Sequence, residues 1–116
     1  MAKNKIPPVD WETMLAGLTI GKINVKYGAD QNIFQQGKAA DSIFYLRKGK
    51  VKLSVISQQG KEAIVAIFSA GEFFGEGCLA GQTVRVASAA AITDCTLDKI
   101  EKQLMERMLH EHQDIS

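Results

Sequence analysis

Short runs of alternating side chains, separated by turns that contain glycine, most constrain how this chain of 116 residues can fold. Apolar and polar residues alternate from Lys22 to Tyr27 and again from Lys50 to Val55, as in a strand that is buried on one face. The turns that separate such strands are marked by Gly28, Gly37, Gly49 and Gly60. Short strands broken by turns about every 8 to 12 residues are typical of an antiparallel sandwich or barrel. The sequence therefore predicts a mainly β fold.

Helical patterns occur only near the two ends of the chain. Asp10 can cap a short helix from Trp11 to about Leu18, in which the apolar residues share one face. Asp98 and Glu101 have the spacing of a capping box, which predicts that a second helix begins at Lys99. The apolar stripe of that helix consists of Ile100, Leu104, Met105, Met108 and Leu109. We expect a jelly-roll (double-stranded β-helix) barrel with a short helix at each end.

The composition fits one soluble domain. Apolar residues make up 46% of the chain and charged residues 23%, and the net charge is +1. This charge gives no reason to expect strong non-specific binding of nucleic acid. No apolar run approaches the ~18 residues that span a membrane, and no signal peptide is visible. We predict a cytoplasmic protein without a membrane partner, with a flexible N-terminal arm at residues 1–9 and one domain at residues 10–116.

The stretch from Gly71 to Thr93 carries the residues with chemical potential. An acid, Glu76, precedes a base, Arg85, and small residues and glycines lie between them. Glycines let a backbone approach a ligand closely, and the N–H groups of a short loop or single helical turn can point at an anion. Arg85 can make a forked, charge-assisted contact with phosphate oxygens. Glu76 only accepts hydrogen bonds, so it suits a sugar hydroxyl. Together these residues predict a pocket for a small ribose phosphate.

Two motifs in this order resemble a known family. Residues 73–79 (FFGEGCL) and 85–88 (RVAS) resemble the phosphate-binding cassette of cyclic-nucleotide-binding domains. Upstream, residues 37–51 (GKAADSIFYLRKGKV) are similar to the repeated glycine pattern of that family. The nearest resemblance is to the sensor domain of Crp/Fnr-type bacterial transcription regulators, over roughly residues 10 to 110. Below, residues 73–88 are called the cassette.

The resemblance implies a ligand and a role for each site residue. The ligand is a cyclic nucleotide such as cAMP, and no cofactor is expected. Arg85 and N–H groups near Cys78 to Ala80 would bind the cyclic phosphate, and Glu76 would bind the ribose 2′-hydroxyl. Apolar side chains on the barrel interior, such as Leu53 and Val65, would pack beside the base. The expected ligand-binding residues are Gly75, Glu76, Gly77, Cys78, Leu79, Arg85, Val86, Ala87, Leu53 and Val65.

The cassette departs from the pattern of catabolite-activator proteins at two positions. Val86 stands where that pattern has a hydroxyl residue directly after the arginine, so one side-chain contact to phosphate is lost. Gly77 replaces a larger aliphatic residue after the glutamate, which loosens the turn.

Two alternative functions differ in the residues that they require. A metal-dependent jelly-roll enzyme needs several converging His or carboxylate ligands, whereas His110 and His112 both lie on the terminal helix and do not share a face. We therefore expect neither a metal site nor catalysis. In the third alternative, the fold relays a signal without a small ligand, and Glu76 and Arg85 form an ion pair that closes the loop.

Membership of the Crp/Fnr type would also imply partners. Such a regulator continues into a dimerisation helix and a helix-turn-helix domain, and this chain contains neither a recognition-helix pattern nor a basic stripe. We expect contact with DNA only through a helix-turn-helix domain absent from this chain. The full-length regulator is expected to be a homodimer, and this chain alone a monomer or weak dimer.

Overall fold

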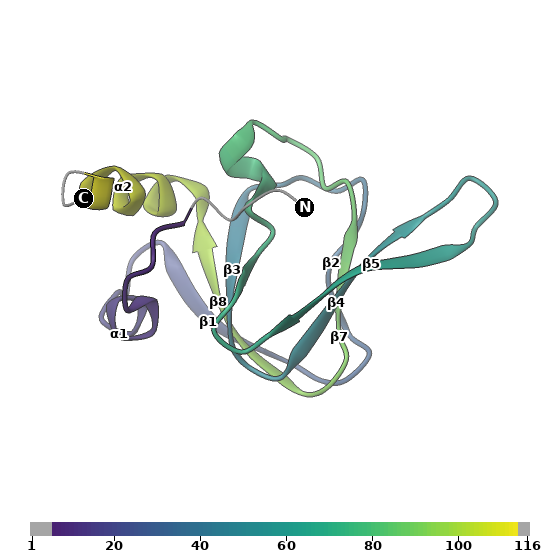
Figure 1. Ribbon diagram of the computed structural model, residues 1–116, viewed down its shortest axis with the longest axis horizontal. Helices are drawn as coiled ribbons and strands as arrows, with labels where there is room; N and C mark the ends of the chain where they lie inside the picture. Colours follow the sequence, from purple (N-terminus) through teal and green to yellow (C-terminus); the bar gives the residue numbers. More distant parts are fainter. Residues whose placement is uncertain (1–5, 114–116) are drawn as a thin grey trace.

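A computed structural model describes residues 6–113 of the chain (Figure 1). Two α-helices lie near the ends, α1 (Trp11–Ala16) and α2 (Lys102–Gln113), and a 3-10 helix, η1 (Glu76–Ala80), lies in the cassette. The strands are β1 (Lys22–Tyr27), β2 (Asn32–Phe34), β3 (Ser42–Lys48), β4 (Lys50–Ile56), β5 (Glu62–Ser69), β6 (Phe73–Phe74), β7 (Ser88–Ala91) and β8 (Cys95–Glu101).

The strands form two four-stranded antiparallel sheets. Their orders are β1-β8-β3-β6 and β2-β7-β4-β5. In Figure 1 the strands wrap around a common interior, α1 and α2 lie beside the β1-β8-β3 sheet, and the β4–β5 hairpin extends away on the opposite side. The predicted mainly β jelly roll with helices at both ends is confirmed. None of the helices in the described residues is long and apolar enough to cross a membrane.

Two hydrophobic cores lie on opposite faces of the β1-β8-β3-β6 sheet. The barrel core, inside the sheets, consists of Phe44, Leu46, Val51, Phe74, Ala89, Ala91, Cys95 and Leu97. The helix core, between this sheet and the helices, includes Trp11, Leu15, Ile43, Tyr45, Phe73, Ile100, Leu104, Met105 and Met108. Successive residues of β3 therefore alternate between the cores, as the period of two requires. A sheet buried on both faces explains why Ser42–Leu46 reads as a continuous buried run.

The beginning of the terminal helix differs from the prediction. Asp98 does not cap it, because Asp98 lies within β8, and α2 begins only at Lys102. Ile100 is buried in the helix core as part of the strand, whereas Leu104 and Met105 reach the same core from α2. The local pattern was overridden because β8 pairs with both β1 and β3, which holds the backbone extended as far as Glu101.

The N-terminal helix is close to the prediction. Asp10 caps α1 by accepting a hydrogen bond from the backbone N–H of Thr13 at 3.2 Å. The helix ends at Ala16, two residues earlier than predicted, and Gly17 follows as its C-cap. Of the predicted N-terminal arm, residues 1–5 lie outside the described residues. In residues 6–9, Ile6 and Val9 pack against the helix core.

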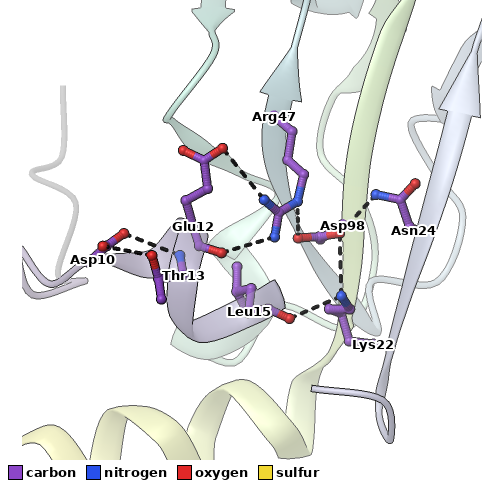
Figure 2. A network of polar contacts seen from close by, with 8 residues as sticks. All are labelled: Asp10, Glu12, Thr13, Leu15, Lys22, Asn24, Arg47 and Asp98. Carbon is purple, nitrogen blue, oxygen red and sulfur yellow. Dashed lines mark hydrogen bonds and ion pairs between the residues drawn. The ribbon is translucent and has the colours of Figure 1, made fainter. Parts of the chain in front are cut away.

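A buried polar network joins α1 to the sheet. Asp98 is fully buried, and its carboxylate accepts hydrogen bonds from Arg47 Nε at 2.6 Å and Asn24 Nδ2 at 3.1 Å. Lys22 Nζ lies 3.8 Å from the same carboxylate. Figure 2 shows that both cations also reach α1: Arg47 Nη2 donates to the Glu12 carbonyl at 3.2 Å, and Lys22 Nζ to the Leu15 carbonyl at 3.0 Å. Asp98 thus positions Arg47 and Lys22, and these two side chains in turn bond to α1.

Candidate ligand-binding site

The cassette folds as one short helical turn between two glycines. Gly75 and Gly81 flank η1 with φ angles of 77° and 92°, in the left-handed region that favours glycine. The predicted loop or single turn is therefore confirmed. The next strand, β7, begins only at Ser88, so Arg85 lies in the segment between η1 and that strand.

Arg85 is the most constrained side chain of the cassette. It is only 6% exposed, and its guanidinium group lies between the start of β3 and the start of the cassette. Nη1 donates to the Gly75 carbonyl at 2.9 Å, and Nη2 donates to the Ser42 carbonyl at 2.7 Å and to Ser42 Oγ at 3.3 Å. Nε is buried and has no acceptor within the described residues. An unsatisfied buried donor is rare in folded proteins, so Arg85 Nε calls for an explanation such as an ordered water or a bound anion.

An aromatic ring covers the guanidinium group. The Cζ atom of Arg85 lies 4.2 Å from the ring centroid of Phe34 and 5.8 Å from that of Phe44. A Cβ at Gly75 would stand 3.0 Å from Arg85 Nη1 and 3.2 Å from Phe34 Cε2. Glycine at this position therefore serves both the turn and the close packing around Arg85.

Burial changes the protonation behaviour of the two buried groups here. Desolvation lowers the pKa of the Arg85 guanidinium from its usual value, and the smaller influences of Cys78 and Asp41 oppose this change. Desolvation likewise raises the pKa of the Cys78 thiol. The thiol therefore stays neutral near pH 7, whereas arginine remains cationic.

Glu76 does not pair with Arg85. It is half-buried at the first position of η1, and within residues 6–113 the ion pairs join Lys22 and Arg47 to Asp98, Arg47 to Glu12, and Lys52 to Glu62. The ion pair that the relay alternative required is therefore absent from the described residues. Arg85 bonds to backbone carbonyls instead.

The remaining cassette residues differ in how deeply they are buried. Cys78 is fully buried in the helix core, and Leu79 packs against that core. Val86 is 63% exposed, whereas Ala87 is buried. Gly77 is covered by the side chain of Gln82, which occupies the space where a Cβ would stand. The turn at Gly77 is thus filled by a neighbour.

The two residues predicted to lie beside the base differ in environment. Leu53 on β4 is half-buried against the barrel core. Val65 is 55% exposed and lies at an irregularity in the β4–β5 register, so that Ala66 stands opposite Leu53. Their role in ligand binding remains a prediction.

Neither Glu76 nor Arg85 lines either of two open cavities. One, of about 660 Å³, lies on the outer face of the β2-β7-β4-β5 sheet and is lined by residues such as Lys52, Ser54 and Ser88. The other, of about 360 Å³, is lined by Phe34, Lys38 and the residues between Asn32 and Gln35.

The sequence also matches a known family. A profile described as "Cyclic nucleotide-binding domain" matches residues 24–112, which include the whole cassette. The chain belongs to the cyclic-nucleotide-binding domain family. It is 31% identical over 91 residues to the cAMP-activated global transcriptional regulator CRP of Pasteurella multocida, an alignment that covers 78% of this chain and 44% of that protein. The chain therefore spans about half the length of the curated regulators that it matches.

Solved structures agree with this assignment. The Catabolite Activator Protein of Thermus thermophilus is 27% identical with a TM-score of 0.76, over 90% of this chain and 48% of that chain. The EAL enzyme Bd1971 in its cAMP-bound form is 28% identical with a TM-score of 0.65, over 80% of this chain and 29% of that chain. The domain is thus similar to parts of both a regulator and an enzyme.

Two site residues were missed by reasoning from the sequence. Phe34 and Ser42 surround Arg85, but they come from β2 and β3. Neither residue belongs to a sequence motif that includes Arg85, so nothing in the sequence indicates that it contacts this side chain. Only the pairing of the strands brings them to the cassette.

Proposed function

We propose that this chain is a sensor domain that binds a cyclic nucleotide such as cAMP through its cassette, as the N-terminal part of a Crp/Fnr-type transcription regulator. The observation that carries this proposal is the buried guanidinium group of Arg85 with an Nε–H that has no acceptor within the described residues. A cyclic phosphate is an anion that can accept this hydrogen bond in a place where water is scarce.

The acid and the base of the cassette suit different parts of such a ligand. Arg85 supplies a full positive charge for the phosphate. Glu76 is half-buried at the start of η1 and has no ion-pair partner within residues 6–113, so its carboxylate is available to a ribose 2′-hydroxyl. A ribose phosphate therefore has one partner at each of these residues.

The relatives support cAMP as the first ligand to test. The bacterial regulators that match this chain are named as cAMP-activated, and Bd1971 is described in a cAMP-bound form.

In the regulator that we propose, DNA is bound only by a helix-turn-helix domain outside this sequence, and the full-length protein is a homodimer.

A second function is favoured by a different property of Arg85. Both of its terminal nitrogens already donate to carbonyl groups of the chain, so much of its hydrogen-bonding capacity is satisfied within the domain. The same fold could therefore act as a ligand-free relay, in which Arg85 only stabilises the cassette.

Titration calorimetry against cAMP, cGMP and a cyclic dinucleotide separates the two functions. Under the sensor proposal at least one of these cyclic nucleotides binds. The linear nucleotide 5′-AMP, which lacks the cyclic phosphodiester and carries more negative charge, should bind more weakly. If none binds at millimolar concentration, the relay function is favoured.

Replacing Glu76 with glutamine tests the ribose contact. The amide oxygen still accepts a hydrogen bond but the charge is lost, so we expect wild-type protein to bind cAMP about 10- to 100-fold more tightly than 2′-deoxy-cAMP. In Glu76→Gln this preference should shrink to a few-fold. Equal affinity of the wild type for both ligands would contradict the assignment of Glu76.

A further inference from the structure

Phe34 supports Arg85 from a different part of the fold. We infer that Phe34 is a positioning residue, whose ring fixes the plane in which the Arg85 guanidinium group meets the phosphate. The centroid of the Phe34 ring lies 4.2 Å from Arg85 Cζ, well within the range of a cation–π contact. Because Arg85 is buried and Phe34 is half-buried, this contact is stronger than one between fully exposed groups.

The carbonyl groups and the ring restrain different motions of the guanidinium group. Hydrogen bonds from Nη1 to Gly75 and from Nη2 to Ser42 restrain the group within its own plane. A ring beside the cationic carbon restrains it perpendicular to that plane. A phosphate that accepts from Nε–H lies near the plane of the guanidinium group, so its position depends on both restraints.

The ring of Phe34 is itself held by the barrel core. Its centroid lies 5.7 Å from that of Phe44 and 6.1 Å from that of Phe74, and these two rings stack at 5.3 Å. Phe34 is therefore a rigid part of the barrel rather than a mobile cover. Phe34 lies on β2, and β2 pairs with β7, the strand that begins at the end of the cassette. The position of the Phe34 ring relative to the cassette is therefore fixed by the sheet.

The first part of the test needs no ligand. In the free wild-type protein, NMR should show slow hydrogen exchange at Arg85 Nε and slow rotation of its guanidinium group. Phe34→Leu should make both at least tenfold faster, whereas Phe34→Trp, which keeps an aromatic face, should restore slow rotation. If Phe34→Leu leaves both rates at wild-type values, the inference is wrong, whether or not a nucleotide binds.

Phe68→Leu is the matched control. Phe68 stacks on Phe74 at 5.4 Å and is half-buried like Phe34, but within the described residues the cation–π contacts of Arg85 are with Phe34 and Phe44 and not with Phe68. Both leucine variants should lower the thermal stability to a similar extent. Only Phe34→Leu should change the Arg85 exchange rates, so a general loosening of the core is distinguished from a loss of positioning.

The second part of the test rests on the proposed function and measures affinity. Phe34→Leu should weaken cyclic-nucleotide binding by about 3- to 30-fold, and Phe68→Leu by less than about twofold. In an Arg85→Ala background the further effect of Phe34→Leu should disappear. Wild-type binding that is unchanged by Phe34→Leu would overturn the inference alone, whereas absence of binding by the wild type would count against the proposed function.

Discussion

Replacing Arg85 with alanine should weaken cyclic-nucleotide binding by about 30- to 150-fold, a loss of roughly 2 to 3 kcal/mol. The phosphate would lose its charge-assisted partner in a site where water is scarce. No basic residue lies between Lys61 and Lys99 other than Arg85, so the cassette itself offers no replacement. Titration calorimetry of both proteins measures the difference directly.

The same substitution also removes hydrogen bonds that hold the cassette. Ser42 and Gly75 would each lose a donor to their carbonyl group, so the folded state of Arg85→Ala must be verified by circular dichroism and thermal unfolding. Arg85→Lys serves as the second variant, because it keeps the charge and loses the forked geometry. We expect it to bind at least about tenfold more weakly than wild type. A folded Arg85→Ala that binds as tightly as wild type would refute the phosphate assignment.

Replacing Asp98 with alanine should destabilise the fold by about 3 to 5 kcal/mol, since it leaves Arg47 and Lys22 without their buried counter-charge. Their side chains are only 17% and 11% exposed, so water cannot fully replace the carboxylate. For a domain of this size the melting temperature should fall by about 12 °C or more. Because both cations also hold α1, the single tryptophan, Trp11, should report the change through a red shift of its fluorescence.

Two further variants serve as comparisons for this stability prediction. Asp98→Asn keeps the shape and one acceptor oxygen, so its loss should be smaller than that of alanine. Glu62→Gln breaks the exposed pair with Lys52, whose charged groups lie 3.4 Å apart, and should change stability by less than about 1 kcal/mol. Equal effects of Asp98→Ala and Glu62→Gln would show that the buried network contributes little.

The fold was predictable from the sequence because its strands carry local signals. Alternation in Lys22–Tyr27 and Lys50–Val55, with glycine turns between, was sufficient to predict an antiparallel β fold. Asp98 shows where local signals fail. Its spacing to Glu101 fits a helix cap, but its carboxylate is bonded to Arg47, 51 residues earlier in the chain. A contact over that distance leaves no trace in a local pattern.

Some features of the candidate site could likewise be predicted from the sequence and others could not. Glu76 and Arg85 were identified because they occupy one continuous motif. The orientation of Arg85 toward the Ser42 carbonyl group could not be predicted, because Ser42 lies 43 positions earlier in the chain. Whether an arginine side chain turns inward depends on which acceptors and rings the fold brings near it, and residue type alone does not determine this.

The two cores on either side of one sheet also constrain how homologous chains can vary in length. Ile43 and Phe44, like Phe73 and Phe74, are neighbours in sequence that pack into different cores. An insertion of one residue in β3, β6 or β8 would exchange the residues of the two cores from that point to the end of the strand. Evolutionary insertions and deletions are therefore expected at the tip of the β4–β5 hairpin, near Gly60, where an added Cβ meets no atom within 4 Å. Between Ser42 and Leu46 the number of residues should stay constant.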